Sequence, residues 1–244
     1  MENELHIESG LQAGTGLPVE SGLPVESGLP EESVLELIGA EEKDVLQEIM
    51  NIAFGNAAAE LAQVINILVV LSVPYVQILR ARELPEYIRS QVGDCESVSI
   101  VEQDFWGEFK GNAIMVFQSG AGRELAFMLN ADDSDIFEPG ATDRFESEIL
   151  MEVGNILIGA CVGKLAELLG DVIQYSPPKV LVENHTNDAL PQNLFDPGSS
   201  AIILRTMFRF NDKDIGGFLF LITSHESIAW LKGALADFMA QYDE

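Results

Sequence analysis

Two pairs of an acidic residue and an asparagine are the side chains of this sequence whose types and spacing could do chemistry. Glu48 precedes Asn51 by three residues, and Glu152 precedes Asn155 by the same spacing. A carboxylate can bind a cationic group, whereas an amide donates and accepts hydrogen bonds while staying neutral. One such pair is common on exposed helices, so the repetition is what indicates a function.

Both pairs lie within a longer internal repeat. Residues 44–55 (DVLQEIMNIAFG) align with residues 148–159 (EILMEVGNILIG). Pro74 then aligns with Pro178, each 23 residues after its asparagine. Proline fixes φ and is typical of strand edges and turns, so we interpret both prolines as structural.

The repeat continues toward the end of the chain. Residues 111–119 (GNAIMVFQS) align with residues 216–224 (GGFLFLITS) after a slip of one residue. We therefore expect residues 37–244 to form one domain made of two related repeats, about 37–135 and 141–244.

The repeated segments have the pattern of amphipathic helices. Positions i, i+4, i+7 and i+11 of a helix lie within about 60° of one another. They carry Asp44, Glu48, Asn51 and Gly55 in the first copy, and Glu148, Glu152, Asn155 and Gly159 in the second. The opposite face is apolar: Leu46, Met50, Ala53, Ala57, Leu61 and Val64, and then Leu150, Val153, Leu157, Cys161 and Leu168. The polar stripe must therefore face solvent or a partner, and its glycine, about 1 kcal/mol worse than alanine within a helix, leaves space beside the asparagine.

The elements around these helices predict an α+β fold. Each half has a long helix (about 41–64 and 143–169), a strand after its proline, a hairpin and a closing helix (about 120–130 and 225–241). The hairpin strands are rich in β-branched and aromatic residues: Val98–Phe105 with Asn112–Phe117, and Ala201–Phe210 with Ile215–Thr223. We expect two pseudo-symmetric halves that form one continuous sheet with flanking helices.

Two features near the first motif lead to further expectations. The apolar run Val64–Val73 is much shorter than the ~20 residues of a membrane helix, so we interpret it as buried core and expect no membrane insertion. Asn56 points about 100° away from the polar stripe, which favours a buried or capping role.

Composition excludes several partners. The chain has 244 residues, 40 acidic against 13 basic side chains and a formal net charge of -27, a balance that disfavours nucleic acid. Cys95 and Cys161 have no metal or redox spacing, and the three histidines are scattered, so we expect no metal site. The first residues lack the pattern of a secretory signal, which predicts a cytoplasmic protein.

Residues 1–36 are predicted to be an acidic, low-complexity, flexible tail. They contain GLPVES at 16–21 and 22–27 and GLPEES at 28–33, with no lysine or arginine before Lys43. Glycine and proline in every unit oppose regular structure.

The spacing Asp/Ser-x3-Glu-x2-Asn-x22-Pro resembles the signature of the CheC/CheX/FliY phosphatases of chemotaxis. The first copy matches it at Asp44, Glu48, Asn51 and Pro74. The second copy matches at its glutamate, asparagine and proline but has Glu148 at the Asp/Ser position. Two copies resemble CheC or FliY, and CheC is the closer resemblance because we expect no further domain after the last helix.

The resemblance implies hydrolysis of the aspartyl phosphate of a CheY-like response regulator, which would supply its own Mg²⁺, so no cofactor of the chain's own is expected. Asn51 and Asn155 would orient the attacking water, and Glu48 and Glu152 would dock a lysine of the regulator. The remaining stripe residues would contact the partner: Asp44, Gly55, Glu148 and Gly159.

Two alternatives stay open at this point. The chain could be a non-catalytic adaptor that binds the response regulator or the receptor deamidase CheD, a second candidate partner that the resemblance implies. A flagellar switch subunit is a weaker alternative, since FliY-like proteins carry an additional switch domain.

Overall fold

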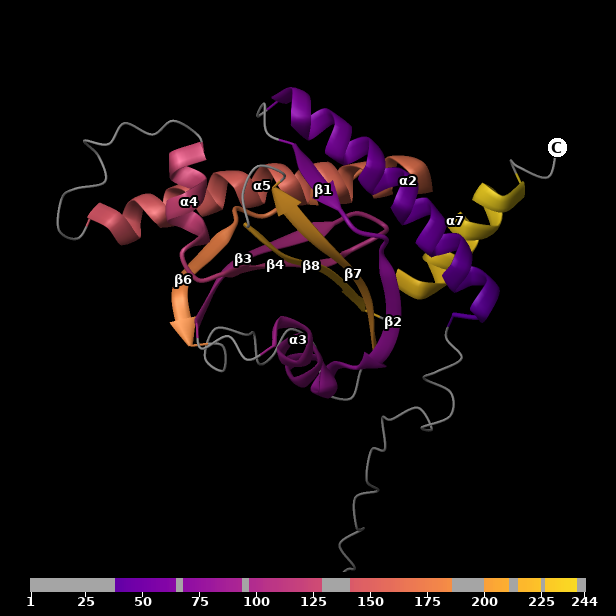
Figure 1. The fold of residues 1–244 in the computed structure, drawn as a ribbon. Helices are drawn as coiled ribbons and strands as arrows, with labels where there is room; N and C mark the ends of the chain where they lie inside the picture. Colours follow the sequence, from indigo (N-terminus) through magenta and orange to yellow (C-terminus); the bar gives the residue numbers. More distant parts are fainter. Residues whose placement is uncertain are drawn as a thin grey trace, which may run out of the picture.

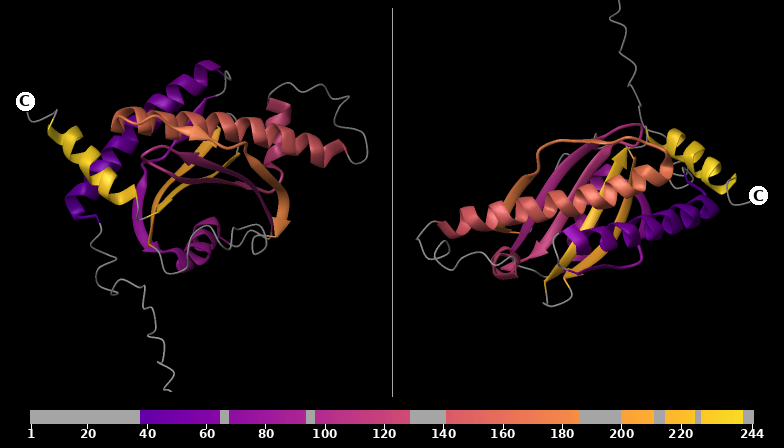
Figure 2. Two further views of the ribbon diagram at one scale, coloured as in Figure 1. Left: turned by 180° about the vertical axis from the view of Figure 1, so that it is seen from behind. Right: turned by 90° about the horizontal axis from the view of Figure 1, so that it is seen from above.

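Two long helices lie side by side across one face of an antiparallel sheet, and a short helix covers the opposite face (Figures 1 and 2). The computed structural model describes residues 38–64, 68–93, 97–128, 141–185, 200–210, 215–224 and 227–240. The predicted tail, residues 1–36, lies outside these ranges.

The long helices are α2 (Ala40–Val64) and α5 (Ala141–Leu169), as the repeat predicted. Helix α2 begins where the backbone N–H of Gly39 donates to Glu42 Oε2 at 2.7 Å, which satisfies a donor at the helix start. Helix α5 ends at Gly170, whose φ of 75° is left-handed and suits a glycine at the end of a helix.

In the part of the chain that the structure describes, eight strands form one sheet: β1 (Val69–Leu71), β2 (Tyr75–Arg80), β3 (Ser97–Trp106), β4 (Gly111–Gln118), β5 (Gln174–Tyr175), β6 (Lys179–His185), β7 (Ser200–Phe210) and β8 (Gly216–Ser224). The order is β1-β7-β8-β4-β3-β5, with β2 also paired to β7 and β6 to β3. All these pairs are antiparallel, and both predicted hairpins, β3–β4 and β7–β8, are present. The predicted α+β fold with one continuous sheet is confirmed.

The two halves exchange strands. Strand β2, after Pro74, pairs with β7 of the second half, and β6, after Pro178, pairs with β3 of the first half. At the centre β4 pairs with β8, so that Ile114 faces Phe220 and Met115 faces Leu219. Each half therefore depends on the other to complete its part of the sheet.

Three shorter α-helices lie within the described residues. Helices α4 (Ala121–Met128) and α7 (Ile228–Ala240) are the predicted closing helices, and α4 packs against α5. Helix α3 (Leu84–Val92), which follows a 3-10 turn at Ala81–Glu83, was not predicted. It buries Leu84 and Ile88 against Ile100, Val116, Ile203 and other residues of the opposite sheet face.

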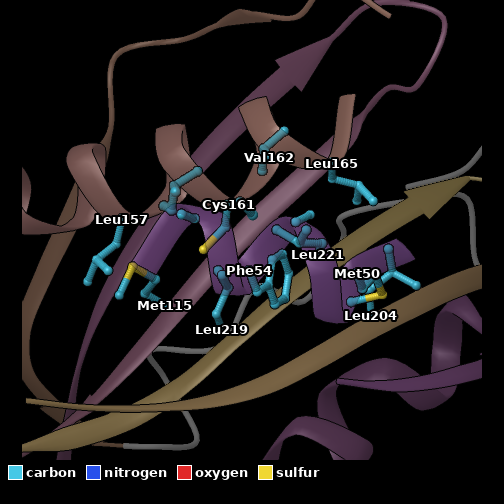
Figure 3. Packing of buried hydrophobic residues seen from close by; sticks show 14 of the residues in the cluster. Met50, Phe54, Met115, Leu157, Cys161, Val162, Leu165, Leu204, Leu219 and Leu221 are labelled. Atoms are coloured by element: carbon cyan, nitrogen blue, oxygen red, sulfur yellow. The ribbon is translucent and has the colours of Figure 1, made fainter. Parts of the chain in front are cut away.

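The main core lies between the long helices and the sheet. Figure 3 shows Met50 and Phe54 of α2 and Cys161 and Leu165 of α5 gathered together with strand residues such as Leu221. All five are at most 1% exposed. Burial of this kind stabilises by roughly 1.5–3 kcal/mol for each large apolar side chain, so these faces hold the helices in place.

One described segment, Arg144–Leu169, is long and apolar enough to cross a membrane by length and composition alone. Half of its apolar window is buried inside the fold, against α2 and the sheet. The core helix of a soluble protein passes the same test, so this property is weak evidence for a membrane span.

Two local expectations were wrong. In the run 64–73, Leu68, Val70 and Val73 are 48, 49 and 71% exposed, whereas Val69 is buried, because part of the run forms a short strand with one face open. Asn56 is exposed and neither buried nor capping, since it lies in the middle of α2 beside the polar stripe.

Candidate functional site

The first polar stripe lies on the outer face of α2. Asp44, Glu48, Asn51 and Gly55 are all exposed, and no side chain of the stripe bonds to another described residue. A Cβ built on Gly55 would meet nothing within 4 Å, so the space beside Asn51 is open. The predicted core residues Leu46, Met50, Ala53, Ala57 and Leu61 are buried on the opposite face.

The second stripe has the same arrangement on α5. Glu148, Glu152 and Asn155 are exposed, Gly159 is half-buried, and a Cβ on Gly159 would also meet nothing within 4 Å. Glu148 accepts a hydrogen bond from Arg144 Nε at 3.2 Å, one turn earlier on the helix. Of the predicted core residues Leu150, Val153, Leu157 and Cys161 are buried, while Leu168 is only partly buried.

Asn155 is anchored from the sheet. Gln103 of β3 donates from Nε2 to Asn155 Oδ1 at 2.9 Å and to the backbone oxygen of Ser176 at 2.8 Å. The hydroxyl of Ser176 in turn accepts the backbone N–H of Asp104 at 3.0 Å. The second asparagine therefore has a defined orientation.

In the first copy of the site, the position that corresponds to Gln103 is occupied by Thr206 of β7, which has a shorter side chain. Ser72 accepts the backbone N–H of Met207 at 3.0 Å, just as Ser176 accepts that of Asp104. Thr206, which precedes Met207 as Gln103 precedes Asp104, donates from its hydroxyl to the backbone oxygen of Ser72 at 2.8 Å. Thr206 makes no described bond to Asn51, so the two sites differ.

A second hydrogen bond is made at the α5 stripe and has no equivalent at the α2 stripe. The hydroxyl of Tyr175 donates to the backbone oxygen of Gly159 at 3.3 Å. Burial, with a smaller contribution from the nearby Cys161, raises the pKa of Tyr175 to about 12, so the hydroxyl stays protonated and remains a donor. In the repeat the position of Tyr175 is occupied by Leu71, which has no hydroxyl.

The two stripes lie on different helices, α2 and α5. An ion pair that joins these helices lies outside both stripes, between Lys164 Nζ and Glu60 Oε1 at 2.7 Å. No cluster of three metal-binding His, Cys, Asp or Glu side chains occurs among the residues that the structure describes.

Sequence reasoning missed Gln103, which bonds to Asn155, and the serine that follows the strand in each repeat. Ser72 and Ser176 each stand two residues before a repeated proline, so the repeat alone could have identified them. Gln103 has a different signal. It alternates with Val101 and Phe105, whose side chains face the core, and a polar residue on that face calls for a partner.

Comparison with known proteins relates the chain to a chemotaxis family. A model described as the CheC-like family matches residues 41–78 and 145–182, which contain both acid-and-asparagine pairs and both repeated prolines. The chain is 26% identical over 206 residues to the CheY-P phosphatase CheC of Bacillus subtilis (strain 168), covering 81% of this chain and 95% of that protein.

Two further similarities agree with this family. The chain is 23% identical over 158 residues to the flagellar motor switch phosphatase FliY of Bacillus subtilis (strain 168), covering 62% of this chain but 39% of FliY. A crystal structure of Thermotoga maritima FliY matches the fold with a TM-score of 0.63 at 20% identity, covering 82% of this chain and 98% of that chain.

Proposed function

The chain is a relative of the CheC/CheX/FliY family, and on that basis we propose that it hydrolyses the aspartyl phosphate of a CheY-like response regulator. The observation that carries the proposal is the duplicated, exposed pair of glutamate and asparagine, each followed by a glycine with open space around it. Solvent-facing side chains at matched positions of two repeats contribute little to packing. Recognition of a partner explains them better.

In the proposed reaction the asparagine amide orients a water molecule. The water oxygen forms a bond to phosphorus as the bond between phosphorus and the aspartyl oxygen breaks. Inorganic phosphate leaves, and the aspartate carboxylate is regenerated. Phosphoryl transfer depends mainly on positioning and charge stabilisation, so one inserted amide at Asn51 or Asn155 can supply most of the phosphatase's contribution.

We assign Glu48 and Glu152 to docking. A carboxylate placed against a phosphoryl group would repel it, whereas the same carboxylate can pair with a lysine of the regulator. Each glutamate lies one turn before its asparagine, so a lysine bound there would lie next to the amide. Asp44 and Glu148 would contact the partner at the flank, and Gly55 and Gly159 would let its surface approach.

We propose that Mg²⁺ enters the reaction with the phosphorylated regulator. The transferred phosphoryl group requires neutralisation of its developing charge, and a metal bound beside it supplies that. The chain's net charge of -27 suits a partner that presents lysine. We place the reaction in the cytoplasm and expect no nucleic-acid partner.

Decay of a phosphorylated CheY-like regulator tests the proposal. The wild-type chain should accelerate the decay, and the Asn51→Ala/Asn155→Ala variant should abolish the acceleration. Asn56→Ala is the matched control, because Asn56 is also an exposed asparagine of α2 but lies off the stripe.

Equal decay rates with the wild-type chain and the double variant would refute the catalytic role. If the wild-type chain did not accelerate decay but still bound the regulator or CheD in a pull-down, a non-catalytic adaptor function would replace the phosphatase function. Glu48→Lys/Glu152→Lys should then abolish that binding.

A further inference from the structure

We propose that Gln103 is a positioning residue that sets the orientation of Asn155, so that the second site is organised before the partner binds and the first site is not. The role in turnover rests on the proposed phosphatase function. The orientation of Asn155 does not, because it follows from hydrogen bonds within the chain.

The geometry of Gln103 allows one arrangement of its amide. Its side chain is 2% exposed, and its two N–H groups are used by Asn155 Oδ1 at 2.9 Å and the Ser176 backbone oxygen at 2.8 Å. The Ser176 oxygen can only accept, so rotating the Gln103 amide by 180° would bring two acceptors together. The nitrogen is therefore fixed toward Asn155.

Gln103 is not explained by stability alone. Its Oε1 is buried without a hydrogen-bond partner. A buried polar atom without a partner is unfavourable, and an apolar residue of the same length would avoid it. An apolar residue would also lose the bond to the Ser176 backbone oxygen, but of the two bonds of Gln103 the one to Asn155 is the one that reaches an exposed side chain of the polar stripe.

The bond determines which end of Asn155 a partner meets. Because Oδ1 accepts from Gln103, the end of the amide that faces the sheet is the oxygen, and Nδ2, which makes no described hydrogen bond, is available to donate to a partner or a water. An amide fixed in this way loses less conformational freedom when the regulator docks. The water at the second site would then be oriented by a group that does not have to reorganise.

The first site lacks this support. Thr206 occupies the place of Gln103 and bonds to the Ser72 backbone oxygen, but its side chain is shorter and makes no described bond to Asn51. Asn51 must therefore become ordered during docking. The two sites should differ in turnover and resemble each other in docking, since Glu48 and Glu152 are both exposed.

Gln103→Met tests the proposal, since methionine keeps the length of the side chain and removes the donor. In the Asn51→Ala background only the second site works. There Gln103→Met should lower kcat roughly five- to tenfold and change KM by less than about twofold. The size of the effect is reasonable because a misplacement of a catalytic group by about 1 Å can lower the rate about 10²-fold. With Asn155→Ala present, the same change should leave kcat as it was. An equal loss in both backgrounds, or no loss in the first, would refute the positioning role.

A measurement on the free protein separates this proposal from the phosphatase function. The ¹⁵N order parameter of the side-chain amide should be high for Asn155 and low for Asn51 in the wild-type chain, which needs no variant. Gln103→Met should lower the Asn155 value to that of Asn51. Equal values in the wild-type chain would overturn the proposal. A chain with unequal values but no effect on regulator decay would instead overturn the phosphatase function.

Discussion

Replacing the two glycines of the polar stripes should make the protein more stable and less active. A Cβ at Gly55 or Gly159 meets nothing within 4 Å, so alanine fits at both positions without displacing a neighbour. Alanine is favoured over glycine within a helix by about 1 kcal/mol. Gly55→Ala/Gly159→Ala should therefore gain about 2 kcal/mol of unfolding free energy, which corresponds to a rise in Tm of about 4–8 °C for a chain of this size.

Activity should fall as the side chain grows. Leucine has nearly the helix propensity of alanine, so Gly55→Leu/Gly159→Leu should keep most of the gain in Tm. Its side chain would fill the space beside each asparagine, and we expect acceleration of regulator decay to drop at least tenfold. Thermal unfolding followed by circular dichroism and the decay assay measure the two effects on the same samples.

Gly233 of α7 provides the control, since a Cβ there also meets nothing within 4 Å and the residue lies outside both stripes. Gly233→Ala should raise Tm by about 2–4 °C and leave activity unchanged. Wild-type activity in the double leucine variant would show that the glycines do not serve the approach of a partner. A fall in Tm for the alanine variants would contradict the open space seen around them.

Three further predictions address docking, packing and the buried thiol. Glu48→Gln/Glu152→Gln should raise KM for the phosphorylated regulator about tenfold or more with a smaller change in kcat, and an unchanged KM would contradict the docking role. Gly154→Ala should lower the unfolding free energy by about 1–3 kcal/mol in urea denaturation, because its Cβ would lie 2.7 Å from a methyl carbon of Val101; a gain like that at Gly159 would contradict this. Burial raises the pKa of Cys161 to about 12, above its ordinary value of 9.0, so its contribution to stability is complete below about pH 9 and declines as the pH rises toward 12. At pH 8 a thiol reagent should label Cys161 only after the protein is unfolded, and peptide mass spectrometry measures the labelling. Labelling of Cys161 in the folded chain would contradict its burial.

Much of the fold could be predicted because its signals are local. The 3.6-residue periodicity of α2 and α5 and the turn between β3 and β4 lie within short stretches of sequence. Helix α3 was missed because it has only nine residues and contains Pro85 in its first turn, and a proline in so short a segment is also typical of a turn. The run 64–73 was misassigned because apolar composition alone does not distinguish a core strand from one with an open face.

The site was predictable on the helices and not in the sheet. Spacing along a helix places Glu48 and Asn51 on one face without any tertiary information. The bond between Gln103 and Asn155 joins two halves of the chain, and it depends on strand pairings that local sequence does not determine. The difference in how the two asparagines are supported therefore emerges only from the tertiary structure.

The exchange of strands between the halves links their folding. A repeat expressed alone would leave one side of its hairpin without β2 or β6, and unpaired strand edges invite association with other chains. Two copies of a single repeat could satisfy one another by the same exchange as a symmetric homodimer. The chain thus has the architecture of such a dimer fused into one polypeptide, and the fusion allows the two copies of the stripe to differ while each half still completes the sheet of the other.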